Sequence, residues 1–162
     1  MKLRPLIFLP LACALLSLAH AAHAQTPPAI TEENVLAVIS AMDKAARAAK
    51  VDDIAAHIAD DVRIKMAVEV AGVEQEIELD REKFIFHTRR GFSKRVAYES
   101  SRQKTEVTIS KDGRRAMVTS ELFEKLTQAE GTLRAVSSEI YVFNLRDGKI
   151  LVTSYDARVR LL

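Results

Sequence analysis

Three glycine-containing turns punctuate the C-terminal half of the chain and constrain its fold more than any other feature. Asp112-Gly113 and Asp147-Gly148 are two-residue turns of the type that joins antiparallel strands, and Glu130-Gly131 is a weaker third. The sequence therefore predicts a sheet of four long antiparallel strands, over residues 98–110, 114–129, 132–146 and 149–161.

Because a tight turn sets the pairing of its two strands, the facing residues can be derived. Around Asp147-Gly148, Tyr141 is expected opposite Ser154, and Glu139 opposite Asp156. The Glu130-Gly131 turn places Ser120 opposite Tyr141 on the same face. We take this as the inner face, because its other end is apolar and can receive helices.

The polar end of the inner face is a candidate site. It carries Gln103, Ser120, Glu139, Tyr141, Ser154 and Asp156. Glu139 and Asp156 face each other, and ionising both carboxyl groups is energetically unfavourable. The pKa of one of them is therefore expected to rise, and a raised carboxyl pKa suits general acid–base catalysis. Two alternatives remain open: Arg158 neutralises the pair at the rim of the sheet, or one β-bulge moves a carboxylate to the other face.

The outer face is expected to be wet at one edge and apolar at the other. Arg102, Lys104 and Glu121 are placed at the wet edge, with Lys104 opposite Glu121. An apolar patch of this size predicts a homodimer, or else a loop or terminus that folds over it. The patch includes Ile140, Val142, Leu151, Tyr155 and Val159.

The front of the domain reads as helices and one strand pair. Thr31 can cap a helix whose apolar residues recur every three or four positions, and a second short helix fits 52–59. Alternation predicts strands over 62–70 and 75–79. Asp80 can cap a third helix, which Gly91 is expected to end.

The first 24 residues have the three parts of an export signal. Lys2 and Arg4 precede an apolar stretch, and small residues at 22 and 24 predict cleavage before Gln25. The stretch is too short for a permanent membrane anchor, while lipidation of Cys13 stays open. Because of this export signal, the protein is predicted to be periplasmic or secreted. Residues 25–30 are expected to form a short tether, and residues 31–162 a single domain.

Once this signal is removed, the composition of the mature chain argues against several classes of function. The remaining chain has 22 basic and 22 acidic residues and no cysteine. Disulfides, a cysteine nucleophile and strong attraction to nucleic acid are therefore not expected. His57 and His87 are the remaining histidines and lack ligand spacing, so we expect neither a metal site nor a cofactor.

The order of these elements resembles the NTF2-like superfamily, which includes SnoaL-like proteins and ketosteroid isomerases. Residues 48–62 are similar to the end of the family's first helix, its second helix and its first strand, and residues 146–154 to its last hairpin. The resemblance implies an α+β fold, a curved antiparallel sheet wrapped around three helices as a cone with an internal pocket. It also implies dimers through the outer side of the sheet.

Carried over residue by residue, the isomerase chemistry has no support. The positions of its oxyanion-hole Tyr and its catalytic base fall at Met42 and Met66, which cannot transfer a proton. These two methionines are instead expected to line an apolar pocket or to fill the core. His57 could face that pocket as a base, or be a half-exposed helix residue.

Three functions follow as hypotheses. The first is a binding protein for a small, mostly apolar ligand, with a pocket lined by Met42, Met66, Phe84, Gln103, Val118, Ser120, Tyr141 and Ser154. The second is an isomerase, cyclase or hydratase, with Glu139, Asp156, Tyr141 and His57 as catalytic groups. The third is a dimeric interaction module that uses the outer face.

Overall fold

A computed structural model describes residues 29–162 of the chain. The predicted export signal, residues 1–24, lies outside the described residues. At the start of the described part, Ile30 is buried and its backbone N–H donates to the Gly113 carbonyl at 2.7 Å. Ile30 is therefore part of the core and not of a tether.

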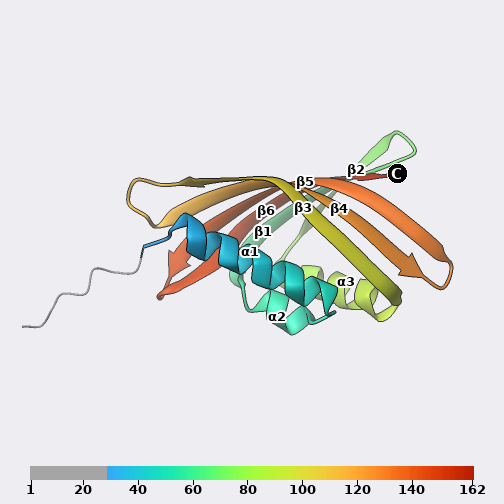
Figure 1. Cartoon of the computed structure of the whole chain (residues 1–162), viewed down its shortest axis with the longest axis horizontal. Helices are drawn as coiled ribbons and strands as arrows, with labels where there is room; N and C mark the ends of the chain where they lie inside the picture. Colours follow the sequence, from blue (N-terminus) through green and yellow to red (C-terminus); the bar gives the residue numbers. More distant parts are fainter. Residues whose placement is uncertain (1–28) are drawn as a thin grey trace, which may run out of the picture.

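The domain is α+β, as predicted, with helices on one face of a curved six-stranded sheet (Figure 1). The strand order is β2-β1-β6-β5-β4-β3; β1 and β6 pair in parallel and all other pairs are antiparallel. The elements in chain order are α1 (Glu32–Arg47), α2 (Val51–Ala55), β1 (Ile58–Val70), β2 (Val73–Leu79), α3 (Arg81–Ser93), β3 (Arg95–Ile109), β4 (Arg115–Gln128), β5 (Gly131–Arg146) and β6 (Lys149–Leu161).

The helix starts follow the sequence signals, but the ends do not. Thr31 caps α1 through a reciprocal pair of hydrogen bonds with Asn34, and the Asp80 carboxylate caps α3 by accepting from the Lys83 N–H. Gly91, expected to end the third helix, lies inside α3. The second helix is shorter than predicted because β1 already begins at Ile58.

The core lies between the helices and the inner face of the sheet. Phe143, Val118 and Val152 on the central strands are fully buried, and Val35 and Ile39 of α1 pack against them. This confirms the apolar end of the inner face. Within residues 29–162, no helix is long and apolar enough to cross a membrane.

A β-bulge in β6 changes the predicted pairing with β5. Near the turn, Phe143 pairs with Val152 as expected, but Val142 then pairs with Ser154, so Thr153 is an extra residue. Beyond this point, each residue of β6 lies on the face of the sheet opposite to the predicted one. Asp156 pairs with Ile140 on the outer face, and Tyr155 turns inward, so the predicted facing of Glu139 and Asp156 is wrong.

A second bulge, in β3, has the same effect at the edge of the sheet. Gln103 pairs with Glu121 and Glu106 with Thr119, which leaves one extra residue in β3, and Lys104 adopts φ 49° there. Arg102 consequently faces inward and Gln103 outward, the reverse of the prediction. The predicted Lys104–Glu121 ion pair is present nevertheless, at 2.8 Å.

The weakest of the three turns lies one residue earlier than expected. Gln128 pairs with Gly131, so Ala129 and Glu130 form the turn. Ser120 therefore pairs with Glu139 and not with Tyr141, which pairs with Val118. This two-residue offset leaves all four residues on the inner face, as predicted.

Candidate functional site

A cavity of about 200 Å³ lies between α1, α3 and the inner face of the sheet. We call it the inner cavity. Most of its lining is apolar and comes from both layers, with Met42, Ala46, Phe84, Phe92, Leu122 and Val152 among the residues. Its polar side chains are few: Asp43, Thr88, Tyr98, Arg102, Glu124, Tyr141 and Tyr155.

Arg102 lines one side of the inner cavity and is the centre of an ion-pair network that continues into the sheet behind it. Its guanidinium donates to both Asp43 oxygens, at 2.8 and 2.9 Å, and also to Glu139 and to the Ser120 hydroxyl. The Arg102 and Glu139 side chains are only 11% and 3% exposed. We call Asp43, Arg102, Ser120, Glu139 and Tyr155 the Arg102 network.

Tyr155 completes the Arg102 network from β6. Its hydroxyl donates to Oε1 of Glu139 at 2.6 Å, while Arg102 binds Oε2. Burial, followed by the neighbouring Tyr141 and Glu139, raises the pKa of Tyr155 well above its ordinary value. Burial opposes the charge of Arg102, but the hydrogen bonds and charges of its acidic partners raise its pKa overall. The network thus pairs one buried guanidinium with the acidic side chains of Asp43 and Glu139.

Glu124 and Tyr98 form a separate polar pair at the α3 side of the inner cavity. The Tyr98 hydroxyl donates to Oε1 of Glu124. Burial raises the pKa of Glu124, the Tyr98 hydrogen bond lowers it, and the charge of Glu139 raises it again, with a net upward shift. Burial and the charge of Glu124 raise the pKa of Tyr98. Glu124 therefore keeps its proton to a higher pH than an exposed carboxyl group does.

Several predicted pocket residues lie at the inner cavity, and others do not. Met42, Phe84 and Tyr141 line it, while Val118 and Ser120 are buried next to it on the inner face. Met66 also faces inward and packs against the core, away from the cavity lining. Gln103 and Ser154 are on the outer face, because the two bulges invert their strands.

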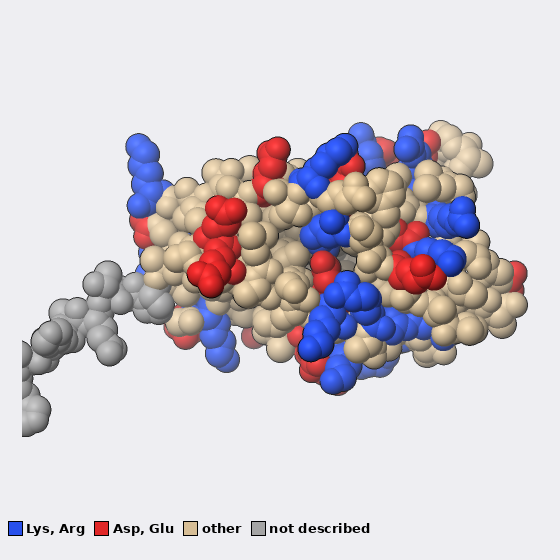
Figure 2. All heavy atoms as spheres, viewed as in Figure 1, with Lys and Arg blue, Asp and Glu red and all other residues tan. Residues whose placement is uncertain are grey.

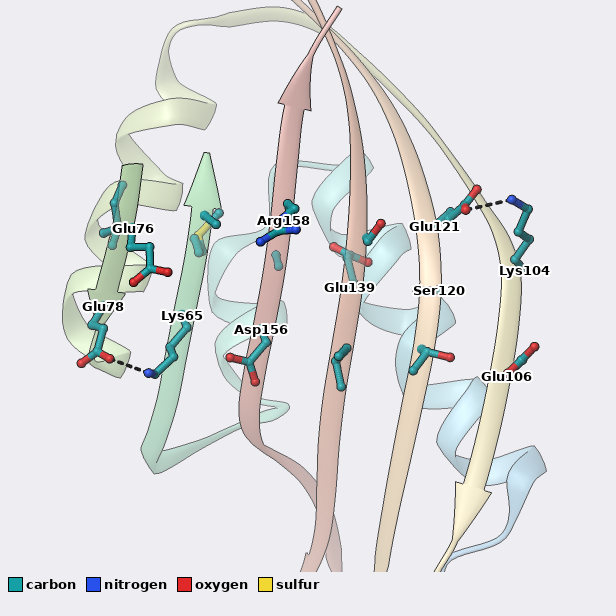
Figure 3. Close-up of a pocket in the computed structure, with 17 residues that line it drawn as sticks. Lys65, Glu76, Glu78, Lys104, Glu106, Ser120, Glu121, Glu139, Asp156 and Arg158 are labelled. Atoms are coloured by element: carbon teal, nitrogen blue, oxygen red, sulfur yellow. Dashed lines mark hydrogen bonds and ion pairs between the residues drawn. The ribbon is translucent and has the colours of Figure 1, made fainter. Parts of the chain in front are cut away.

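The four predicted catalytic groups are not brought together. Glu139 is held in the Arg102 network, and Tyr141 stacks against Tyr155 with ring centroids 4.6 Å apart. His57 lies in the turn after α2, outside the cavity lining. Asp156 lies on the outer face, on the strand next to Lys65 (Figure 3).

Sequence reasoning missed Asp43, Tyr98, Arg102 and Glu124. Glu124 has the parity of Ser120 and Leu122, so continuing the alternation of its strand by two residues would have found it. Asp43 follows the predicted pocket residue Met42. Arg102 had no such signal, because the bulge at Lys104 that turns it inward is not visible as a glycine or proline.

The outer face is hollowed into a second, larger groove of about 630 Å³ (Figure 3). We call it the outer groove. Charged side chains from all six strands border it, and two ion pairs cross between neighbouring strands, Lys65–Glu78 and Lys104–Glu121, both at 2.8 Å. Elsewhere, Figure 2 shows acidic and basic side chains interspersed over the face in view.

The predicted dimer surface is divided by the bulge in β6. Ile140, Val142 and Leu151 remain on the outer face, and Ile140 is 42% exposed. Tyr155 and Val159, expected there, face inward. Met117, 41% exposed on the neighbouring β4, adds to the outer apolar surface.

A metal centre has no support in the part of the chain that the structure describes. Among residues 29–162, no three His, Cys, Asp or Glu side chains come together in a group that could hold a metal ion. The carboxylates of the Arg102 network are paired with the guanidinium instead.

Comparison with known proteins identifies the fold through structure alone. No protein-family model and no curated protein matches the sequence. A conserved protein from Planctomyces limnophilus has a similar structure, with a TM-score of 0.69, 18% identity, and coverage of 81% of this chain and 97% of that one.

Two further similar structures come from candidate dehydratases. A candidate scytalone dehydratase from Novosphingobium aromaticivorans has a TM-score of 0.66 and 8% identity, over 78% of this chain and 82% of that one. A candidate dehydratase of the NTF2-like family from Streptomyces avermitilis has a TM-score of 0.61 and 12% identity, over 78% and 93%. With its curved six-stranded sheet and its helices on one face, this chain has the NTF2-like fold.

Proposed function

We propose that the protein binds a small, mostly apolar molecule with one polar group in the inner cavity. The observation that carries this proposal is the composition of the cavity. Apolar side chains form most of the lining, and the Tyr98–Glu124 pair offers a hydrogen-bonding position among them. A few convergent polar groups in an apolar cavity are typical of small-molecule sites.

The polar groups of the inner cavity favour a neutral ligand. Asp43 and Glu124 place carboxyl groups in the cavity lining, and its one guanidinium, Arg102, is already paired with Asp43 and with the buried Glu139 beside the cavity. An anionic group would enter without a free positive partner and lose its hydration. A hydroxyl or carbonyl group instead can exchange hydrogen bonds with Glu124.

Tyrosine fluorescence provides a direct binding experiment. The chain has three tyrosines and no tryptophan, and all three tyrosines line the inner cavity. Titration with cyclohexanol is expected to change their emission in a saturable way. Ala46→Leu, which fills the cavity from α1, should abolish the change. Ala41→Leu, on an exposed position of the same helix, is the matched control and should bind normally.

General acid–base catalysis is the second candidate function, now with Glu124 as the acting group. The raised pKa of Glu124 inside an apolar cavity favours it, because a carboxyl group that titrates closer to neutrality can both accept and donate a proton. The similar candidate dehydratases agree with such chemistry but show the fold alone.

Proton exchange separates binding from catalysis. If Glu124 acts as a base, the protein should accelerate deuterium incorporation next to the carbonyl of cyclohexanone in D2O, followed by NMR. Glu124→Gln keeps an acceptor for Tyr98 and should lose the acceleration while cyclohexanol still binds. Acceleration that persists in Glu124→Gln would rule out Glu124 as the base.

We further propose that the protein is exported and works as a homodimer. Export is supported by the sequence of residues 1–24 and predicts a mature protein that starts at Gln25, which intact mass spectrometry of periplasmic or secreted material would detect. Association is supported by Met117 and Ile140, which expose apolar surface at diagonal positions of the neighbouring strands β4 and β5 on the outer face.

A further inference from the structure

A third hollow opens next to the inner cavity and shares residues with it. It has a volume of about 280 Å³ and lies between α3 and the ends of β4, β5 and β6. We call it the entrance groove. Thr88, Phe92, Tyr98 and Glu124 line both the entrance groove and the inner cavity. The two spaces therefore adjoin at the Tyr98–Glu124 pair.

The outer part of the entrance groove is apolar although it is open to water. Its remaining lining residues are Gly91, Leu126, Leu133, Ala135 and Leu161. Leu133 is 50% exposed and Leu161 38% exposed. Nothing in this set can donate or accept a side-chain hydrogen bond, so the entrance groove suits a hydrocarbon segment and not a second polar group.

We infer that the ligand is a neutral, elongated amphiphile whose polar group lies at Tyr98 and Glu124 and whose alkyl chain extends along the entrance groove. This inference rests on the proposed binding in the inner cavity and adds the class of ligand. The continuity of the two apolar spaces carries it, because a compact molecule in the inner cavity would leave the exposed leucines of the entrance groove without a function.

Gly91 is the position at which the entrance groove can be closed without harm to the fold. It lies on the face of α3 that carries Thr88, three residues away, and a Cβ built there meets no heavy atom within 4 Å. Its backbone is helical, so a larger residue is favoured over glycine by local propensity. Gly91→Leu should fill the groove, and Gly91→Ala is the matched control that changes propensity with little volume.

The test is a chain-length series of primary alcohols, measured by tyrosine emission. For 1-hexanol, 1-octanol and 1-decanol, affinity is expected to rise by up to about fourfold per added methylene buried. Gly91→Ala should keep this rise. Gly91→Leu should bind cyclohexanol as the natural protein does but gain nothing from 1-hexanol to 1-decanol. Decanoate at neutral pH should bind at least about tenfold more weakly than 1-decanol, because its carboxylate meets the acidic cavity.

A second variant protects the test against misfolding of Gly91→Leu. Leu133→Asp introduces a charge at a half-exposed position of the entrance groove and should weaken 1-decanol selectively. Affinity that is independent of chain length while cyclohexanol binds would overturn the inference and leave the proposed function intact. Equal 1-decanol affinity in the natural protein and both variants would also overturn it. If cyclohexanol and all alcohols fail to bind, the proposed function itself fails.

Discussion

The Tyr155 hydroxyl donates to Oε1 of Glu139 at 2.6 Å, and this contact exists because β6 carries one extra residue at Thr153. Without that residue, Tyr155 would lie on the outer face and Asp156 would face inward next to Glu139. The inner face therefore holds the Glu139 carboxylate with the Tyr155 hydroxyl that donates to it, and not the predicted pair of carboxylates. The bulge decides the chemistry of this end of the sheet.

Removing the Tyr155 hydroxyl should therefore destabilise the domain. Tyr155→Phe leaves one oxygen of a buried carboxylate without its donor, which costs about 1–3 kcal/mol in the free energy of unfolding. The measurement is urea denaturation of Tyr155→Phe, Glu139→Gln and the double variant. A double-mutant cycle with no coupling energy would contradict the contact.

Arg102 should be the most sensitive position of the network. Arg102→Met removes the partner of Asp43 and Glu139, and breaking such a buried pair costs about 3–5 kcal/mol.

Urea denaturation at neutral pH measures this loss. Arg146→Met, which removes the exposed ion pair with Asp61, is the control and should change stability little. Equal losses for the two variants would mean that the Arg102 network contributes no more than a surface pair.

Glu124 should give the protein a pH-dependent stability. Its pKa in the folded protein is raised above the ordinary value of 4.5. The folded state therefore keeps a proton that the unfolded chain releases, and stability falls as pH rises from about 4.5 through the raised pKa.

Glu124→Gln should remove this decline, since Gln stays neutral and still accepts from Tyr98. Thermal unfolding of both proteins between pH 4 and pH 8 would show curves that diverge with rising pH. Glu121→Gln, on the outer face of the same strand, is the control and should follow the natural protein.

At Lys104, in the β3 bulge, a β-branched residue should destabilise the domain, whereas glycine should not. The φ of 49° at this position is accessible to glycine and strained for side chains branched at Cβ. Lys104→Val should lower the free energy of unfolding by roughly 1–2 kcal/mol, whereas Lys104→Gly should be close to neutral. Thr105→Val, which is outside the positive-φ region, is the control. Equal stability of the two valine variants would argue against the bulge.

The proposed dimer can be tested at Ile140. Sedimentation velocity of the natural protein should show a concentration-dependent dimer. Ile140→Lys, which places a charge in the exposed apolar surface, should shift it to monomer. Lys111→Glu, at an exposed position in the turn between β3 and β4, should leave association unchanged. A natural protein that stays monomeric at all concentrations would refute the dimer.

Local signals predicted most of the architecture. The Asp147-Gly148 turn fits its two-residue hairpin because both residues have positive φ, which this turn requires. The Thr31 and Asp80 caps also lie where short side chains that accept hydrogen bonds precede helical patterns. Such signals depend on a few neighbouring residues, so a sequence displays them directly.

The residues of the candidate site could be predicted only where the strands alternate between the two faces of the sheet without a bulge. Ser120, Glu139 and Tyr141 face inward as expected, because no bulge separates them from one another. Arg102, Gln103, Tyr155 and Asp156 were all assigned to the wrong face, because each lies beyond a bulge that inverts its strand. Neither lysine nor threonine is a residue type from which a bulge at position 104 or 153 could be predicted.

The sequence by itself determined the order of helices and strands, the apolar end of the inner face and the places of the two strong hairpin turns. The turn at Asp147-Gly148 has two residues as predicted, whereas the one at Asp112-Gly113 is a four-residue loop, 111–114, because Ser110 pairs with Arg115. Turn chemistry and hydrophobic periodicity act over a few residues and leave their trace in the chain. Tertiary structure alone decided which charged and aromatic groups meet in the Arg102 network. Asp43 on α1, Arg102 on β3, Glu139 on β5 and Tyr155 on β6 come together only after two one-residue shifts, and such shifts are set by packing across the whole sheet.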